Sequence, residues 1–230
     1  YPNQPPAHAL SVADKWVMGR LYQAQCDVTK ALSTYRFDLA AQACYEFIWN
    51  EYCDWYIELA KVQLIHGNEA QQGATRWTLV HVLEVALRLM HPIAPFITEE
   101  LWQSVAPLAN AKHTDSIMLS AWPSEPLIDE DPEASRWLLA LKDIINAVRN
   151  LRGQMGIGPA TRLPLLLEGQ PSHQAFLAYI KPLAKLSDAH LVPHLPEEDA
   201  PIAVVGEIRL MLKMEVDPAE ERVRLSKQLA

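Results

Sequence analysis

The sequence predicts a mainly α-helical protein: an antiparallel helical bundle, followed by a small α+β domain and then the start of a further helix. Three observations predict this fold class. Large apolar residues recur at steps of three and four over most of the first half of the 230 residues. Prolines and glycines mark the ends of these segments. In the second half, residues 207–216 instead alternate between apolar and mostly polar side chains, which is typical of a half-buried strand.

The first predicted helix begins near Ser11 and ends near Ser33. Ser11 and Asp14 fit a capping box, because the Ser11 oxygen can accept a bond from an early backbone N–H. Asp14 also lies near the positive end of the helix, where an acidic side chain is favourable. A short break follows over residues 35–38, and Asp38 is the expected cap of the next helix.

The second predicted helix is rich in large aromatic residues, with six of them between Tyr45 and Glu58. The residues that recur at helical steps, and are expected to share one buried face, are Tyr45, Trp49, Tyr52, Tyr56 and Leu59. Phe47 and Trp55 lie off that face. A helix with bulk on several sides needs several neighbours, so we expect it at the centre of the bundle. It ends near His66, before Gly67 and Asn68.

Two further helices complete the predicted bundle. One covers about residues 70–91 and stops before Pro92, because proline cannot continue a helix. The next follows Thr98, whose hydroxyl can cap it, with Glu99 and Glu100 in the first turn. Four helices joined by short links are typical of an antiparallel bundle.

We place a domain boundary in the acidic, proline-containing linker 123–132. It separates a helical bundle over residues 1–122 from a small α+β domain over residues 133–216. In that domain, helices are predicted over 133–154 and 172–186, and strands over 162–168, 203–205 and 207–216. Residues 217–230 open like a helix, with Asp217 as cap and Pro218 in the first position, and are expected to continue into a longer charged helix.

Composition excludes several classes of protein. No run of 18 apolar residues occurs, so no transmembrane helix is expected, and the N-terminus lacks the features of a signal peptide. The formal net charge of −8 argues against a nucleic-acid binder held by bulk electrostatics. Cys26, Cys44 and Cys53 lack metal-binding spacing and are expected to be buried, reduced thiols of a cytosolic protein. Because the chain does not begin with Met, we expect it to be a piece of a longer protein or a processed chain.

No pattern in the sequence is typical of a catalytic or metal site. Glu99 and Glu100 are adjacent, so their side chains diverge on a helix. His190 and His194 would need a helix to bind one metal, and Pro193 disfavours it. No glycine-rich phosphate loop or serine nucleophile motif occurs. The sequence therefore predicts no catalytic residue, no metal site and no cofactor within this chain.

Several strings, in order along the chain, carry a resemblance to one family. They are YEFIWNEYCDWYIE over residues 45–58, LRLMHPIAPFITEELW over 87–102 and VRNLRGQM over 148–155. With these strings the chain resembles the anticodon-binding helical domain, and the region after it, of class Ia aminoacyl-tRNA synthetases. Within that class it is most similar to the enzymes for valine, and those for isoleucine are the alternative.

The resemblance implies a function in RNA binding. A monomer in the cytoplasm, without membrane contact, would hold the anticodon stem-loop of valine tRNA by stacking on splayed bases and pairing cations with phosphates. The cations expected at this interface are Lys15, Arg20, Lys30, Arg36, Arg149 and Arg152. Trp16, Tyr35 and Phe37 are candidates for stacking on a base, although aromatic residues mostly serve the core. Arg20 can alternatively pair with an acid in the bundle, and Arg149 and Arg152 can form a solvated helix face.

The resemblance also implies which parts of such an enzyme are absent from this sequence. The HxGH-type and KMSKS-type motifs of the class do not occur. We therefore expect the parent enzyme to attach valine to its tRNA with ATP and Mg²⁺ bound in another domain, and this piece alone to be inactive. Residues 217–230 would begin a C-terminal coiled-coil arm. The rival hypothesis, favoured by the acidic charge, is a helical protein–protein interaction module without an RNA ligand.

Overall fold

In the computed structural model the chain forms two compact units, Tyr1–Leu138 and Leu139–Ala230. The structure describes residues 4–158, 160–197 and 200–213. The predicted helix over 217–230 and the last residues of the predicted strand, 214–216, lie outside the described residues. Residues 120–131, which include most of the predicted linker, form neither helix nor strand.

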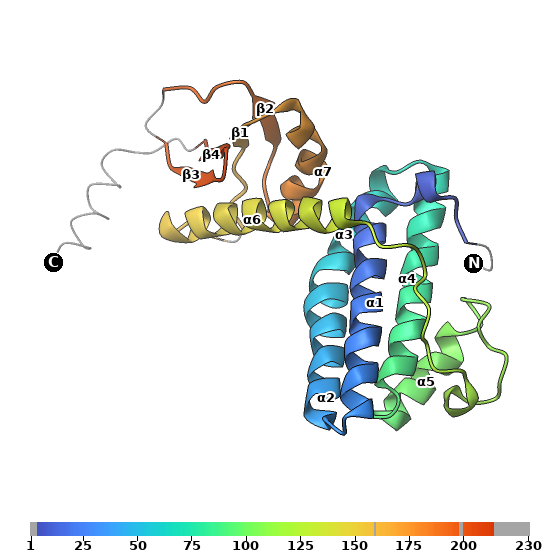
Figure 1. The fold of residues 1–230 in the computed structure, drawn as a ribbon. Coiled ribbons are helices and arrows are strands. Elements are labelled where there is room, and N and C mark those ends of the chain that lie inside the picture. Colours follow the sequence, from blue (N-terminus) through green and yellow to red (C-terminus); the bar gives the residue numbers. More distant parts are fainter. Residues whose placement is uncertain (1–3, 159, 198–199, 214–230) are drawn as a thin grey trace. The chain divides into compact units, whose positions relative to one another are not determined.

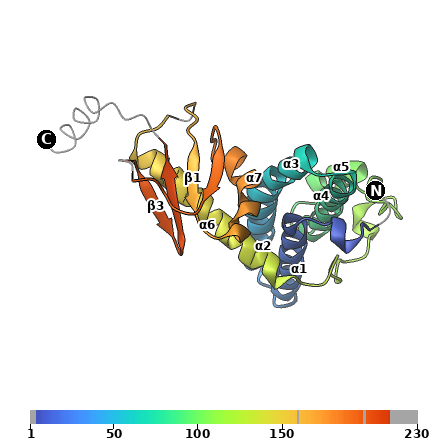
Figure 2. The same ribbon diagram turned by 90° about the horizontal axis from the view of Figure 1, so that it is seen from above.

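The first unit is helical (Figure 1). Its elements in order are η1 (Ala7–Ala9), α1 (Val12–Ser33), α2 (Phe37–Tyr45), η2 (Glu46–Tyr56), α3 (Ile57–His66), α4 (Glu69–Met90), α5 (Pro95–Val105) and η3 (Ile117–Leu119). A further helix, α6 (Pro132–Gln154), starts in this unit and continues into the second. Helix α1 packs against α2, η2 and α4, and α5 packs against α4 (Figure 1, Figure 2). Within the described part of the chain, no helix is long and apolar enough to cross a membrane.

The caps of the first two helices confirm one prediction and correct another. Ser11 Oγ accepts a bond from the Asp14 backbone N–H at 3.1 Å, and Asp14 Oδ2 accepts one from the Ser11 N–H at 2.8 Å. The predicted capping box is therefore present. The prediction that Asp38 caps the next helix is wrong, because α2 already begins at Phe37. Asp38 lies in the first turn and pairs with Arg36 instead.

The predicted aromatic helix is continuous from α2 to α3, but its middle part, η2, is a π-helix. In a π-helix the backbone bonds join residues five apart, and the Ile57 N–H donates to the carbonyl of Tyr52. Residues five apart therefore lie on nearly the same side. Phe47 and Tyr52 both face the core as a result, with exposed fractions of 2% and 6%.

This wider winding corrects the predicted buried face. Tyr56, the last residue of η2, and Leu59 of α3 are buried as predicted. Tyr45 and Trp49, expected in the core, are 59% and 55% exposed, whereas Phe47, expected off the face, is buried. The physical cause is the π-helix η2, because the α-helical spacing does not hold across a segment with wider turns.

The side chain of Asp14 is fully buried and joins three helical segments. Tyr56 Oη donates to Asp14 Oδ1 at 2.6 Å, and Thr75 Oγ1 donates to Asp14 Oδ2 at 3.1 Å. The Ser11 hydroxyl donates to the same Oδ2 at 2.8 Å. Burial raises the pKa of Asp14, and the hydrogen bonds from Tyr56, Ser11 and Thr75 oppose that shift. Residues of α1, η2 and α4 thus share one carboxylate.

A second buried carboxylate, Glu84, joins α4 to α5. Trp102 Nε1 donates to Glu84 Oε1 at 2.9 Å, and Arg88 Nη2 donates to Glu84 Oε2 at 2.8 Å. The other end of the Arg88 guanidinium donates to the carbonyl of Ala121 at 2.9 Å. This chain of contacts fixes the segment after η3 to the long helix α4.

The second unit combines the later part of α6 with a four-stranded sheet. Its other elements are β1 (Leu165–Glu168), η4 (Pro171–His173), α7 (Gln174–Leu183), β2 (Ala189–Val192), β3 (Ile202–Val205) and β4 (Ile208–Leu212). The strand order is β2-β1-β4-β3, with β1 and β2 parallel and the other pairs antiparallel. Gly206, at φ 57, makes the turn between β3 and β4. The unit is α+β, as the sequence predicts.

Two details of this unit differ from the sequence predictions. The strand predicted over 207–216 is present as β4, but Leu210, Met211 and Leu212 are all fully buried. The strand is therefore covered on both faces there, not half-buried. Strand β2 was not predicted, because its four residues have no alternation and include His190. In the first unit, the expectation that all three cysteines are buried holds only for Cys44, because Cys26 is exposed and Cys53 is half-buried.

Replacing Asp14 with alanine should destabilise the first unit by about 3 kcal/mol, because buried donors from three segments lose their common acceptor. Replacing Tyr56 with phenylalanine removes one donor only and should cost about 1 kcal/mol. Urea unfolding followed by circular dichroism measures both. In the double variant the Tyr56→Phe change should add little, and fully additive effects would contradict a shared network.

Stability below neutral pH should depend on His81 of α4. Its Nδ1 lies 2.8 Å from the carbonyl of Trp77, its ring stacks on that indole, and burial lowers its pKa. The unfolded chain then binds the proton first, so the unfolding free energy should fall as pH drops below about 6.5. In His81→Asn this part of the pH dependence should vanish. Urea unfolding at pH 7.5 and 5.5 tests it, with the exposed His66→Asn as control, and an unchanged slope would contradict the assignment.

Candidate nucleic-acid interface

The six cations predicted at an RNA interface are spread over both units. Along α1 and the turn after it lie Lys15, Arg20, Lys30 and Arg36. The last two turns of α6, in the second unit, carry Arg149 and Arg152. Because an α-helix rises about 1.5 Å per residue, Lys15 and Lys30 are roughly 22 Å apart along α1. The structure does not bring all of these cations into one cluster.

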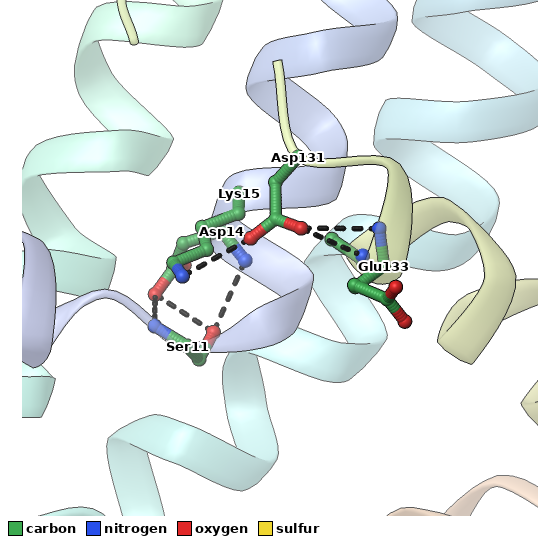
Figure 3. A network of polar contacts seen from close by, with 6 residues as sticks. Ser11, Asp14, Lys15, Asp131 and Glu133 are labelled. Carbon is green, nitrogen blue, oxygen red and sulfur yellow. Dashed lines mark hydrogen bonds and ion pairs between the residues drawn. The ribbon is translucent and has the colours of Figure 1, made fainter. Parts of the chain in front are cut away.

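Lys15 holds the start of α6 within the first unit (Figure 3). Its Nζ lies 3.1 Å from Asp131 Oδ2, and hydrogen bonding to Lys15 lowers the pKa of Asp131. The other oxygen, Asp131 Oδ1, accepts bonds from the backbone N–H groups of Glu133 and Ala134. One carboxylate thus binds Lys15 and caps α6, so this lysine has a structural partner.

Arg20 pairs with an acid inside the helical unit, which confirms the alternative given above for this residue. Its Nε donates to both carboxylate oxygens of Glu51 on η2, at 2.8 and 3.0 Å. The Arg20 side chain is 43% exposed and that of Glu51 is 18% exposed. The pair fixes the arginine on the surface of α1 while the contact uses only one of its three nitrogens.

Lys30 and Arg36 lie at the far end of α1, beside the α1–α2 turn (residues 34–36). Lys30 is exposed, and its side chain makes no ion pair with any described residue. Arg36 forms a two-bond contact with Asp38 at 2.7 and 2.9 Å, on the surface. The arginine lowers the pKa of Asp38 to about 2, so this pair is charged at all physiological pH values.

A hollow of about 350 Å³ adjoins this turn, which we call the α1–α2 hollow. Its lining residues are Asp27, Lys30, Ala31, Thr34, Leu39, Gln42, Ala43 and Glu46. Gln42 Nε2 donates to Glu46 Oε1 at 2.8 Å, so amide and carboxylate groups stand side by side here. Such groups can pair with the donor and acceptor edges of an unpaired base.

Two aromatic side chains project at the same turn. Tyr35, with φ 58, is 81% exposed, and Phe37 is 60% exposed. Their ring centroids are 6.4 Å apart and the rings are almost perpendicular, at 77°. The third aromatic candidate, Trp16, is buried in the core, so the hypothesis that it stacks on a base is wrong.

A second exposed aromatic pair, formed by Tyr45 and Trp49, was not predicted from the sequence. The ring centroids of Tyr45 and Trp49 are 6.3 Å apart, and the angle between the ring planes is 10°. Both side chains lie on the outer face of α2 and η2. Both had been assigned to the core because their spacing matches that of Tyr52 and Tyr56. Only recognition of the π-helix could have placed them outside.

In the second unit, Arg149 and Arg152 have different environments. Arg149 is exposed, and its Nη2 donates to the carbonyl of Leu183 at 3.2 Å. Arg152 is 7% exposed, and its Nη2 donates to the carbonyls of Gly158 and Thr161 at 3.1 and 2.7 Å. The interpretation of Arg152 as part of a solvated face is wrong, because its guanidinium holds the loop after α6.

Comparison with known protein families assigns the chain. A family described as the anticodon-binding domain of tRNA ligase matches residues 14–167, from the first turn of α1 into β1. The chain belongs to this family. All six predicted cations and both exposed aromatic pairs lie within the matched range. No group of three or more His, Cys, Asp or Glu side chains able to hold a metal occurs among the described residues.

Individual relatives are similar over almost the whole chain. The valine–tRNA ligase of Chromobacterium violaceum is 62% identical over 219 residues, and that of Laribacter hongkongensis is 59% identical over the same length. The valine–tRNA ligase of Neisseria meningitidis serogroup B is 53% identical. Each alignment covers 95% of this chain but 23% of the relative. The chain therefore spans about a quarter of the length of the relatives that it matches.

Proposed function

We propose that this chain is the part of a bacterial valine–tRNA ligase that binds the anticodon stem-loop of valine tRNA. The observation that carries the proposal is the family match over residues 14–167, together with relatives of that name at 59% and 62% identity. In this proposal the first unit is an antiparallel bundle of the class Ia type, and the protein works as a monomer in the cytoplasm. The longer protein would join valine to its tRNA with ATP and Mg²⁺ bound elsewhere.

The α1–α2 turn is the part of the first unit that we assign to the anticodon loop. Bases that leave the stack of an RNA loop bind to exposed aromatic rings and to polar groups at their edges. Tyr35 and Phe37 offer such rings, the α1–α2 hollow offers polar groups, and Lys30 and Arg36 offer charges for the phosphates. On a chain of net charge −8, a local group of cations is the form that RNA binding must take.

The other two cations of α1, Arg20 and Lys15, are expected to contribute less to tRNA binding. The bonds between Arg20 and Glu51 use Nε, so the outer nitrogens of Arg20 can still donate to a phosphate. Lys15 would have to exchange its contact with Asp131, which also caps α6. We therefore expect Arg36 and Lys30 to matter most, Arg20 less and Lys15 least.

The double variant Lys30→Gln, Arg36→Gln should bind valine tRNA about tenfold more weakly at 0.1 M salt, because two phosphate contacts are lost. The slope of log affinity against log salt should fall by about 1.5. Fluorescence anisotropy with labelled tRNA at several salt concentrations measures both. Lys61→Gln, which removes an exposed lysine of α3 that pairs with Glu58, is the matched control and should leave binding unchanged.

The same assay separates anticodon recognition from general RNA binding. Wild-type protein should bind valine tRNA more tightly than the same tRNA with a changed anticodon. If the folded double variant bound like wild type, the assignment of Lys30 and Arg36 would be wrong, while the family would stand.

One observation favours a second candidate function, a protein–protein interaction module. Exposed apolar side chains gather on α5, where Phe96 is 91% exposed, Ile97 54% and Leu101 45%. Such a patch is typical of a surface that binds another protein. Salt separates the two functions, because RNA affinity falls steeply with salt and an apolar contact changes little. Absence of any tRNA binding would favour this alternative.

A further inference from the structure

We infer that the second unit carries a binding site for a phosphate group, in a hollow between the end of α6 and the turn that follows α7. This hollow, which we call the α6–α7 hollow, has a volume of about 420 Å³. Its lining residues are Arg149, Arg152, Gly153, Ile157, Leu183, Ala184 and Lys185. All of its charged lining residues are cations, although acidic residues outnumber basic ones in the chain by 28 to 20.

Arg152 forms the buried base of the site. Its side chain is 7% exposed and makes no ion pair with any described residue. Two backbone carbonyls accept bonds from Nη2, but Nη1 is buried without a hydrogen-bond partner in the described structure. Buried charges in proteins are normally paired, because a lone charge removed from water is strongly unfavourable. An anion in the adjoining hollow would supply the missing countercharge.

Lys185 and Arg149 place two more positive charges at the rim. Lys185 follows the end of α7 in a left-handed conformation, with φ 53, and its N–H donates to the carbonyl of Pro182 at 3.2 Å. Its ammonium makes no hydrogen bond or ion pair with any described residue. Arg149 is anchored to the carbonyl of Leu183 at 3.2 Å, so its guanidinium is held at the hollow. Three cations in one hollow repel each other unless an anion lies between them.

Gly153 leaves the space that a ligand needs. It lines the hollow from α6, and a Cβ atom added there would meet no other atom within 4 Å. A phosphate group fits this chemistry better than a carboxylate. It can accept several charge-assisted bonds at once from guanidinium and ammonium groups on different sides.

The inference rests on the proposed function only for the source of the phosphate, which we assign to the RNA backbone. A backbone phosphate carries no base identity, so this site should add affinity without distinguishing anticodons. It differs in this respect from the α1–α2 turn. Free inorganic phosphate shares the same chemistry and is the other source to be tested.

The test compares Gly153→Glu, which adds a negative charge to the hollow, with Gly153→Gln, which adds the same volume without charge. Neither change strains the backbone, since Gly153 is helical with open space beside it. Valine tRNA should bind to the glutamate variant about tenfold more weakly than to the glutamine variant, and equally so when its anticodon is changed. Lys185→Gln should lower affinity about threefold and reduce the salt slope by about 0.8.

Inorganic phosphate, titrated into the same proteins, identifies the source. Shifts of the arginine Nε–H signals in NMR spectra should appear in wild type and be absent in Gly153→Glu. Phosphate-dependent shifts with unchanged tRNA affinity would retain the site and assign it to free phosphate. If the glutamate and glutamine variants bound tRNA equally and phosphate caused no shifts, the site would be refuted. The proposed function would be unaffected, because it depends on the anticodon comparison.

Discussion

Asp14 lies in the first turn of α1, and donors from α1, η2 and α4 converge on its carboxylate. A buried carboxylate is costly unless its oxygens are bonded, so the three segments are held at positions where their donors reach it. The cap of α1 and the packing of the aromatic helix thereby become one constraint. Because Tyr56 must reach Asp14, this constraint also fixes how η2 is rotated about its own axis. The exposed pair of Tyr45 and Trp49 lies outside because Phe47, Tyr52 and Tyr56 of the same continuous helix are held inside.

Several cations of this acidic chain make contacts that stabilise its own fold. Lys15 binds the carboxylate that caps α6, Arg20 binds Glu51, and Arg152 holds the loop after α6. Two cations whose side chains make no ion pair with any described residue lie at the ends of helices. Lys30 lies in the last turn of α1, and Lys185 lies just after α7. An acidic surface around such positions discourages unspecific binding of polyanions and leaves local attraction. The negative net charge is therefore compatible with RNA binding.

The sequence predicted those features that depend on local chemistry. The capping box of Ser11, the helix ends before Pro92 and Gly67, and the strand predicted over 162–168 and observed at 165–168 follow from neighbouring residues. Features that depend on tertiary contact were not predicted. Asp14 was expected only as part of a capping box, Arg152 was expected at an RNA interface or on a solvated helix face, and β2 pairs with β1 although its own sequence does not alternate. Of the candidate interface, the exposure of Tyr35 and Phe37 agrees with the break predicted over 35–38. The exposure of Tyr45 and Trp49 depends on the winding of η2, which the sequence did not predict.

The π-helix has a consequence for how related sequences are compared. The buried positions from α2 into this segment, Cys44, Phe47, Tyr52 and Tyr56, include one step of five, as if one residue had been added to an ordinary helix and kept as a wider turn. Residues on the two sides of this turn cannot be drawn on one helical wheel. A homologue without the extra residue could keep the same core while presenting a different outer face. Differences in surface recognition among relatives could then arise from a change of helical winding without any change in the residues that form the core.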